Sequence, residues 1–176
     1  MTRQPEKTQL TEDELALYLR LQAKVGYRQT GKVVFESFFP ILPMVPYELA
    51  VVRKIDGLDH VLLWYREDEH YIGWHMPGSY LRFGESDRQV IERTLSKEVG
   101  LTLVSAEFIC HFNTPPETGW VPNHQIAQFF LCETSGEPTT EEFFLIDALP
   151  EKILDFHRIY INHLHAYLLC KKSREV

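Results

Sequence analysis

The sequence lacks any apolar run approaching the length of a transmembrane helix, although 44% of its 176 residues are hydrophobic. A membrane-spanning helix needs about 20 consecutive apolar residues. The N-terminus is polar and charged, which is not typical of a secretory signal peptide. Only three cysteines are present, and their wide spacing along the chain matches neither a disulfide framework nor a metal site. We therefore expect reduced, structural thiols and a cytoplasmic location.

The chain also lacks an excess of basic residues. It has 18 Lys and Arg against 25 Asp and Glu, which gives a net charge of −7. This balance argues against broad binding to nucleic acid polymers or to anionic membranes, but it leaves room for a local phosphate pocket. The eight histidines form no cluster with metal-ligand spacing.

Residues 1–46 have the character of an N-terminal extension. Thr11 and Glu14 form a capping box, which predicts a helix over about 12–27. The apolar segment from Val33 to Pro46 is interrupted by three prolines, and is therefore expected to be an edge strand or a covering segment. Such an extension either packs on the core or builds a homodimer, and the sequence does not choose between them.

Residues 47–176 read as one α+β domain. Alternating and apolar segments separated by turn signals predict strands, and a long periodic segment predicts a closing helix. The strands are expected at 47–54, 60–66, 101–112, 124–133 and 142–146, with a turn at Asp56-Gly57 and the helix at about 152–171. This order fits a mixed sheet between helices.

The most informative stretch is residues 77–101. Tyr80 to Phe83 alternates in a way that predicts a short strand. Ser86 and Gln89 form a second capping box, and Gly100 stands where a helix normally ends. The stretch is therefore expected to form a loop, one helix and a second loop.

Glu98 lies on the apolar stripe of this helix, with Ile91 and Leu95. A carboxylate in such a stripe is costly unless it is paired or binds a metal. Glu98 is therefore expected either to form a salt bridge, to Arg82 or Arg93, or to be a metal ligand that faces a pocket. Glu85, just before the helix, has the same two alternatives, an ion pair with Arg93 or a metal reached through water.

Residues 79–101 resemble the Nudix box, the loop–helix–loop of Nudix hydrolases. The matching residues are Glu85, Arg93, Leu95, Glu98, Gly100 and Leu101, and the departures are Ser79, Thr94 and Lys97. The resemblance covers about residues 47–170 and implies an α/β/α sandwich. It also implies a Mg²⁺ site, with Mn²⁺ as the alternative, formed by Glu98, Glu85 and a backbone carbonyl at Ser79. Helix geometry turns Lys97 away from the stripe.

The order of residues 92–100 is similar to that of the GDP-mannose mannosyl hydrolase branch, whose helix also lacks the middle carboxylates. Those enzymes use a His of a late loop as the base, and the corresponding loop here, 136–142, has none. Glu141 or Glu142 is the nearest substitute. His124 and His111, which flank the loop 113–123, are the other candidates for the general base.

Three arginines are candidates for phosphate or substrate binding, because guanidinium geometry suits phosphate: Arg66, Arg82 and Arg93. Tyr80 and Trp120 are weaker candidates for stacking on a base. The expected function is hydrolysis of a nucleoside diphosphate linked to another group, such as a sugar nucleotide. The alternatives are a catalytically impaired Nudix-fold binding or sensor module, and a weak hydrolase with no dedicated substrate.

Overall fold

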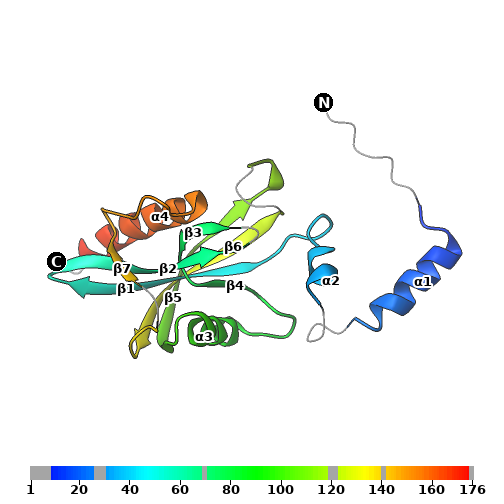
Figure 1. Cartoon of the computed structure of the whole chain (residues 1–176), viewed down its shortest axis with the longest axis horizontal. Coiled ribbons are helices and arrows are strands. Elements are labelled where there is room, and N and C mark those ends of the chain that lie inside the picture. The colour runs from blue at the N-terminus through cyan, green and yellow to red at the C-terminus, as the bar shows by residue number, and fades with distance from the viewer. Residues whose placement is uncertain (1–8, 26–30, 69–70, 119–122, 140–141, 175–176) are drawn as a thin grey trace. The chain divides into compact units, whose positions relative to one another are not determined.

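The computed structural model describes residues 9–25, 31–68, 71–118, 123–139 and 142–174. The chain forms two compact units, Met1–Phe38 and Phe39–Val176 (Figure 1). No helix in the described parts of the chain is long and apolar enough to cross a membrane.

The first unit contains helix α1, Glu12–Gln22, and the short helix α2, Lys32–Glu36. The predicted capping box is present, because Thr11 and Glu14 each bond the other's backbone N–H. The helix ends earlier than predicted, at Gln22. Of the two alternatives for Val33–Pro46, the edge strand does not form at Val33, because the prolines begin only at Pro40 and residues 32–36 form a helix instead. A 3.8 Å ion pair between Lys32 and Glu36 accompanies this helix. The covering segment stays a prediction.

The second unit is built on one mixed sheet. Its strands are β1 Pro46–Ile55, β2 Leu58–Glu67, β3 Ile72–His75, β4 Gly78–Tyr80, β5 Thr102–Thr114, β6 Gln125–Ser135 and β7 Glu142–Leu145. The strand order is β3-β2-β1-β6-β5, with β4 also paired to β1 and β7 to β2. The β1–β6 pair is parallel and the other pairs are antiparallel, which confirms the predicted mixed sheet.

Two helices cover this sheet, α3 Asp87–Glu98 on one face and α4 Asp155–Lys172 on the other (Figure 1). Successive strand residues point to opposite faces. Leu49 and Val51 of β1 accordingly pack in the cluster that contains Leu95 of α3, while Ala50 packs with Ile161 of α4. The predicted α/β/α sandwich is confirmed.

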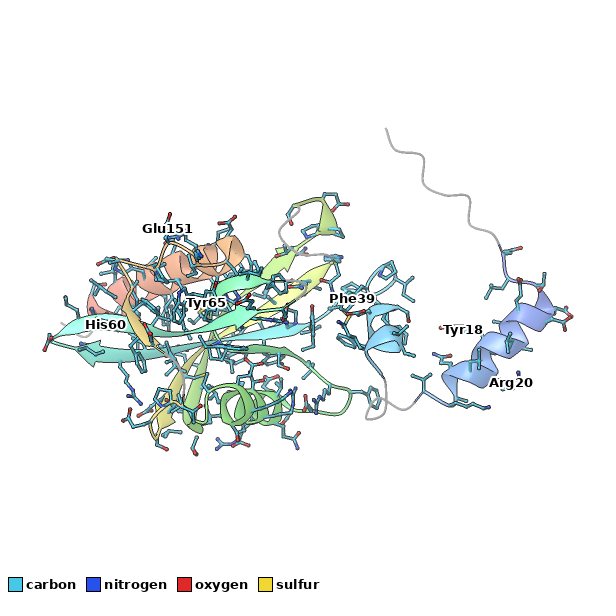
Figure 2. All side chains as sticks on the ribbon, viewed as in Figure 1. Tyr18, Arg20, Phe39, His60, Tyr65 and Glu151 are labelled. Carbon is cyan, nitrogen blue, oxygen red and sulfur yellow. The ribbon has the colours of Figure 1, made fainter. Side chains whose placement is uncertain are left out.

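Strand β3 was not predicted, and β4 lies two residues earlier than the expected strand at Tyr80–Phe83. β3 has only four residues, and it forms a strand because it pairs with β2, where Trp74 lies opposite Tyr65. The two rings meet edge to face at 5.4 Å, and Tyr65 is labelled in Figure 2. The Trp74 N–H also donates to the Lys152 carbonyl, which ties β3 to the segment before α4.

The alternation of β1 has one consequence for function. It places Tyr47 and Glu48 on opposite faces of the sheet. Tyr47 donates a hydrogen bond to Asp87 at the start of α3, whereas Glu48 lies against His157 of α4. The strand thus brings a carboxylate into the layer between the sheet and α4.

Candidate functional site

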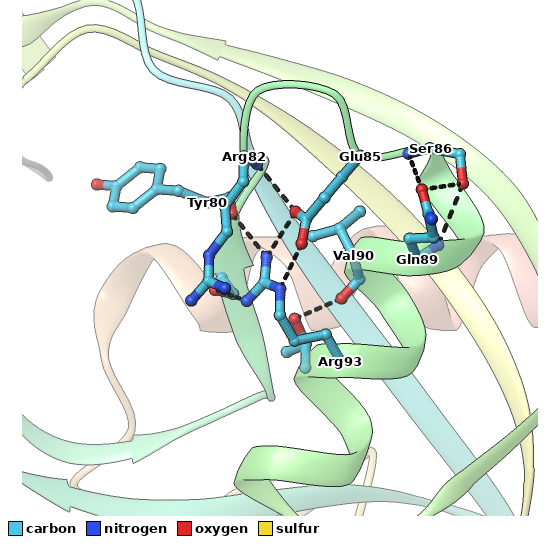
Figure 3. A network of polar contacts seen from close by, with 9 residues as sticks. Tyr80, Arg82, Glu85, Ser86, Gln89, Val90 and Arg93 are labelled. Atoms are coloured by element: carbon cyan, nitrogen blue, oxygen red, sulfur yellow. Dashed lines mark hydrogen bonds and ion pairs between the residues drawn. The ribbon is translucent and has the colours of Figure 1, made fainter. Parts of the chain in front are cut away.

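Helix α3 begins at the second predicted capping box. The Gln89 side chain accepts the Ser86 N–H at 2.8 Å, and Ser86 Oγ accepts the Gln89 N–H (Figure 3). The residue after the helix, Val99, is the C-cap, and Gly100 follows with φ of 71°, a left-handed conformation that favours glycine. Both predicted ends of this helix are confirmed.

Glu85 is held by Arg93 at the start of the helix. Its carboxylate accepts Nε of Arg93 at 2.7 Å, Nη2 at 2.9 Å and the Arg82 N–H at 2.9 Å (Figure 3). Arg93 also donates to Ser79 Oγ and to the Tyr80 carbonyl, each at 3.0 Å. These hydrogen bonds from Arg93 are the main reason that the pKa of Glu85 is lowered. Of the two alternatives for Glu85, the ion pair is therefore present.

The two departures in the middle of the helix do not supply metal ligands. Thr94 is buried, and its hydroxyl donates to the Val90 carbonyl at 2.7 Å. Such a bond back to the preceding turn satisfies a hydroxyl within its own helix. Lys97 is exposed, as helix geometry predicts.

Glu98 is partly buried at the other end of the helix. Its Oε2 accepts the N–H of Gly78 at 3.0 Å, and Glu98 forms no ion pair with any described residue. Burial raises the pKa of Glu98 to about 7, against the smaller opposing effects of the Gly78 N–H and of three cations, of which Arg66 is the first. The predicted salt bridge to Arg82 or Arg93 is absent among the described residues.

A second carboxylate, Glu48, meets Glu98 at Gly78. A Cβ at position 78 would lie 2.8 Å from Oε2 of Glu48, while the Gly78 N–H is bonded to Glu98. Glu48 is only 7% exposed, and its Oε2 has no hydrogen-bond partner among the described residues. Burial, followed by the charge of Glu98, raises the pKa of Glu48.

His157 stands next to Glu48 without neutralising it. Its Nδ1 lies 3.8 Å from Oε2 of Glu48, close enough to count as an ion pair if the ring were protonated. Burial, however, lowers the pKa of His157 well below its usual value, as it lowers the pKa of the neighbouring His75 to about 4. Burial therefore favours neutral rings, and the Met76 N–H, which Nδ1 of His157 accepts at 3.5 Å, fits an unprotonated nitrogen at this contact.

Arg66, at the end of β2, is the cation that acts on both carboxylates. Its charge lowers the pKa of Glu48 and of Glu98. The guanidinium donates to Asp68 and lies 5.0 Å from the centre of the Tyr71 ring. Of the three predicted arginines, Arg66 has the largest effect on the pKa of Glu98.

The other predicted residues are not joined to Glu98 by any contact within the described parts of the chain. Arg82 is exposed, and His111 is exposed on β5.

The remaining candidates have other partners or lie elsewhere. His124 Nε2 lies 2.8 Å from Asn113 Oδ1, and Glu142 begins β7 opposite Leu63. Glu141 and Trp120 lie outside the described residues. Tyr80 accepts a hydrogen bond from Gln125. No group of three or more His, Cys, Asp or Glu side chains that fits a metal ion occurs among the described residues.

Sequence reasoning missed Glu48 and His157. One signal for Glu48 was present, since it is a single carboxylate at the start of the apolar run Leu49–Val52. A charge inside a buried strand is costly unless it has a partner, which marks it for attention. Its neighbours Gly78, Glu98 and His157 are distant in sequence and only the fold brings them to β1.

The molecule is similar in structure to known proteins, although scans of its sequence against protein-family models and curated proteins return no match. A MutT NUDIX hydrolase from Burkholderia pseudomallei matches at 26% identity over 69% of this chain and 98% of that chain, with a TM-score of 0.59. A NUDIX hydrolase from Nitrosomonas europaea matches at 16% identity over 71% and 90%, with a TM-score of 0.59. The NUDIX domain of Shewanella oneidensis NrtR, in a cocrystal with ADP ribose, matches at 15% identity over 90% and 99%, with a TM-score of 0.57.

The chain has the Nudix fold. Residues 79–101 span the loop before α3, the helix itself and the turn at Gly100. Glu85 lies just before α3 and Glu98 is its last residue, and the assignment of residues 79–101 as a Nudix box stays a prediction.

Proposed function

We propose that the protein is a divalent-metal-dependent Nudix-type hydrolase of a nucleoside diphosphate linked to a further group, with sugar nucleotides as the first substrate class to test. The observation that carries this proposal is the carboxylate of Glu98. It is partly buried, bonded to the Gly78 N–H, and without an ion pair among the described residues. An unpaired carboxylate in such surroundings is costly, and a bound cation removes that cost.

Oxygen donors at this place suit Mg²⁺ or Mn²⁺, which bind through one or two carboxylates together with substrate phosphates. Glu98 would hold the cation, which when bound would neutralise charge on the diphosphate oxygens. Arg66, whose charge already acts on Glu98, would orient a phosphate, and the exposed Arg82 would meet substrate from the loop. Arg93 is bonded to Glu85, Ser79 and Tyr80, so we assign it to holding the loop. The candidates for the general base are His124, His111, Glu141 and Glu142.

The test is release of phosphate and sugar from a panel of nucleoside diphosphate derivatives, with Mg²⁺ and with chelator. We expect turnover of one class that stops in chelator. Glu98→Gln should reduce turnover by about 100-fold, the upper end of what loss of a supporting group at a metal site costs. The matched control is Glu92→Gln on the same helix, whose carboxylate pairs with Arg88 on the exposed side. Full turnover by Glu98→Gln would contradict the proposal.

A binding or sensor module is the second candidate, and a particular observation favours it. Of the acidic positions that the resemblance implies, Thr94 bonds its own helix, Lys97 is exposed and Glu85 is neutralised by Arg93. Only Glu98 remains. If this candidate is right, a folded protein that is silent across the panel should bind ADP ribose, the ligand of the NrtR domain, in the presence of chelator. Strict dependence of that binding on Mg²⁺ would count against a metal-independent module.

A further inference from the structure

Two carboxylates from different layers of the fold converge on one backbone position. Glu98 comes from the end of α3 and accepts the Gly78 N–H. Glu48 comes from β1, on the face that α4 covers, and its Oε2 lies 2.8 Å from the position that a Cβ of residue 78 would take. Residues 48 and 78 also face each other across the β1–β4 pair, so the sheet itself fixes their relative positions.

No Lys or Arg among the described residues lies within ion-pair distance of Glu48, although the charge of Arg66 lowers its pKa. Nδ1 of His157 lies 3.8 Å from Glu48 and accepts the Met76 N–H at 3.5 Å, as an unprotonated nitrogen does, and the Arg66 guanidinium donates to Asp68. Oε2 of Glu48 is buried and has no hydrogen-bond partner in the part of the chain that the structure describes. A buried carboxylate without a partner either holds a proton or coordinates a cation. The geometry favours a cation here, because a second carboxylate stands at the same glycine.

We propose that Glu48 and Glu98 together hold the divalent cation, with Glu48 supplying from β1 the second carboxylate that α3 lacks. This inference rests on the proposed function, since it names the residues that bind the metal of that same site. Thr94 and Lys97 offer no carboxylate from the helix, and the strand offers one instead. Two carboxylates with substrate phosphates and water are a common donor set for Mg²⁺.

The role of Gly78 follows from the same arrangement. Any side chain at this position would enter the space of the Glu48 carboxylate, at 2.8 Å from Oε2, and approach the Tyr47 carbonyl at 3.1 Å. Real Cβ contacts are not this short, so Glu48 would have to move. Gly78 is therefore a positioning residue, and Gly78→Ala displaces Glu48 while leaving both carboxylates in the protein.

The experiment is calorimetric titration of the full chain with Mn²⁺ alone, at about pH 8, where the carboxylates are readiest to bind a metal. We expect Glu48→Gln and Glu98→Gln each to weaken Mn²⁺ binding by about tenfold or more, as for loss of a group that supports a metal site. Glu92→Gln should bind like the wild type. Melting curves of the same proteins give a second measurement. Metal-free Glu48→Gln should melt at a higher temperature than metal-free wild type, because a neutral amide replaces a buried carboxylate.

The outcomes separate this inference from the proposed function. If Glu98→Gln loses Mn²⁺ binding and turnover while Glu48→Gln keeps wild-type affinity, the function stands and Glu48 is only a buried acid. If the wild type binds no Mn²⁺, both fail. If Glu48→Gln does not fold, the Mn²⁺ affinity of Gly78→Ala tests whether Glu48 binds the metal. A loss of Mn²⁺ affinity in that variant, with its fold intact, supports the pair, and unchanged affinity overturns it.

Discussion

Helix α3 has a glutamate near each end, Glu85 just before its start and Glu98 as its last residue, and the surroundings of the two carboxylates differ. At its beginning, Glu85 accepts three hydrogen bonds, two of them from the Arg93 guanidinium, and its pKa falls. At its end, Glu98 accepts one backbone N–H, lies near a second carboxylate, and its pKa rises to about 7. A neutralised carboxylate holds a loop in place, whereas a pair of carboxylates without a cation is suited to bind one.

The largest loss of stability is expected at the start of α3, where Arg93 neutralises Glu85. Arg93→Ala removes the partner of Glu85 and also the bonds to Ser79 and the Tyr80 carbonyl. Both side chains of the pair are less than one-fifth exposed. Breaking a buried pair on one side costs about 3–5 kcal/mol, and we expect about 3 kcal/mol from this partly exposed one. Denaturant unfolding measures this loss.

Arg88→Ala is the matched control on the same helix. Arg88 and Glu92 also form an ion pair, but their side chains are 64% and 45% exposed. An exposed pair of this spacing contributes about 0.3–0.5 kcal/mol. Equal losses for Arg93→Ala and Arg88→Ala would mean that the Glu85 end is no better held than an ordinary surface pair.

The next largest effect is the pH dependence of stability that Glu98 causes at the end of α3. The pKa of Glu98 is raised from 4.5 to about 7, so the folded protein favours its protonated form. The resulting stability is complete below pH 4.5 and is lost as the pH rises through about 7. Glu98→Gln removes this loss, and metal-free protein should gain about 2–3 kcal/mol at about pH 8 and little at about pH 4. Urea unfolding at both pH values measures the gain.

Glu85 should change stability with pH in the opposite direction to Glu98, because its pKa is lowered and not raised. Its pKa is lowered by Arg93, so its contribution is present above the usual pKa and is lost as the pH falls through the folded value. Glu85→Gln should therefore destabilise the protein at neutral pH and have little effect in acid. If both glutamine variants respond to pH in the same direction, the comparison between the two ends is wrong.

A smaller effect is expected for the pH dependence of metal binding. A cation at Glu98 must displace its proton below a pKa of about 7. The dissociation constant for Mn²⁺ should therefore rise about tenfold between roughly pH 8 and pH 6. Calorimetric titration at the two pH values tests this, and the residual binding of Glu98→Gln should depend less on pH. A flat profile for the wild type would place the metal elsewhere.

The smallest effect is expected at Lys97. The side chain is exposed at the end of the helix, where solvent and salt screen its charge. Lys97→Glu should therefore change the Mn²⁺ affinity by less than about twofold. A large increase in affinity would show that position 97 can reach the metal, which would weaken the case for a carboxylate supplied by β1.

Much of the fold was predictable because its signals are local. The capping boxes at Thr11 and Ser86 each need only the residue three positions on, and both helices begin where these boxes predict. The turn at Asp56-Gly57 is present with positive φ at both residues. Strand β3 escaped prediction because its order comes from pairing with β2, a property of the sheet that its own four residues do not encode.

The candidate site was only half predictable for a related reason. Glu85 and Glu98 belong to one continuous stretch of sequence, and Glu85 is only eight residues before its partner Arg93. A contact this local can be predicted from spacing along the chain. Glu48 is brought to Glu98 by the β1–β4 pairing and to His157 by the packing of α4. These contacts join residues that are far apart along the chain, and the periodicity of one segment carries no information about them.

The most direct test of the account is a crystal of the protein soaked with Mn²⁺ and a nucleoside diphosphate, with the metal located by its anomalous scattering. We predict one strong peak beside Gly78, bonded to the carboxylates of Glu48 and Glu98, with Glu85 still bonded to Arg93. A peak bonded to Glu85, or one that leaves Glu48 without contact to the metal, would contradict it.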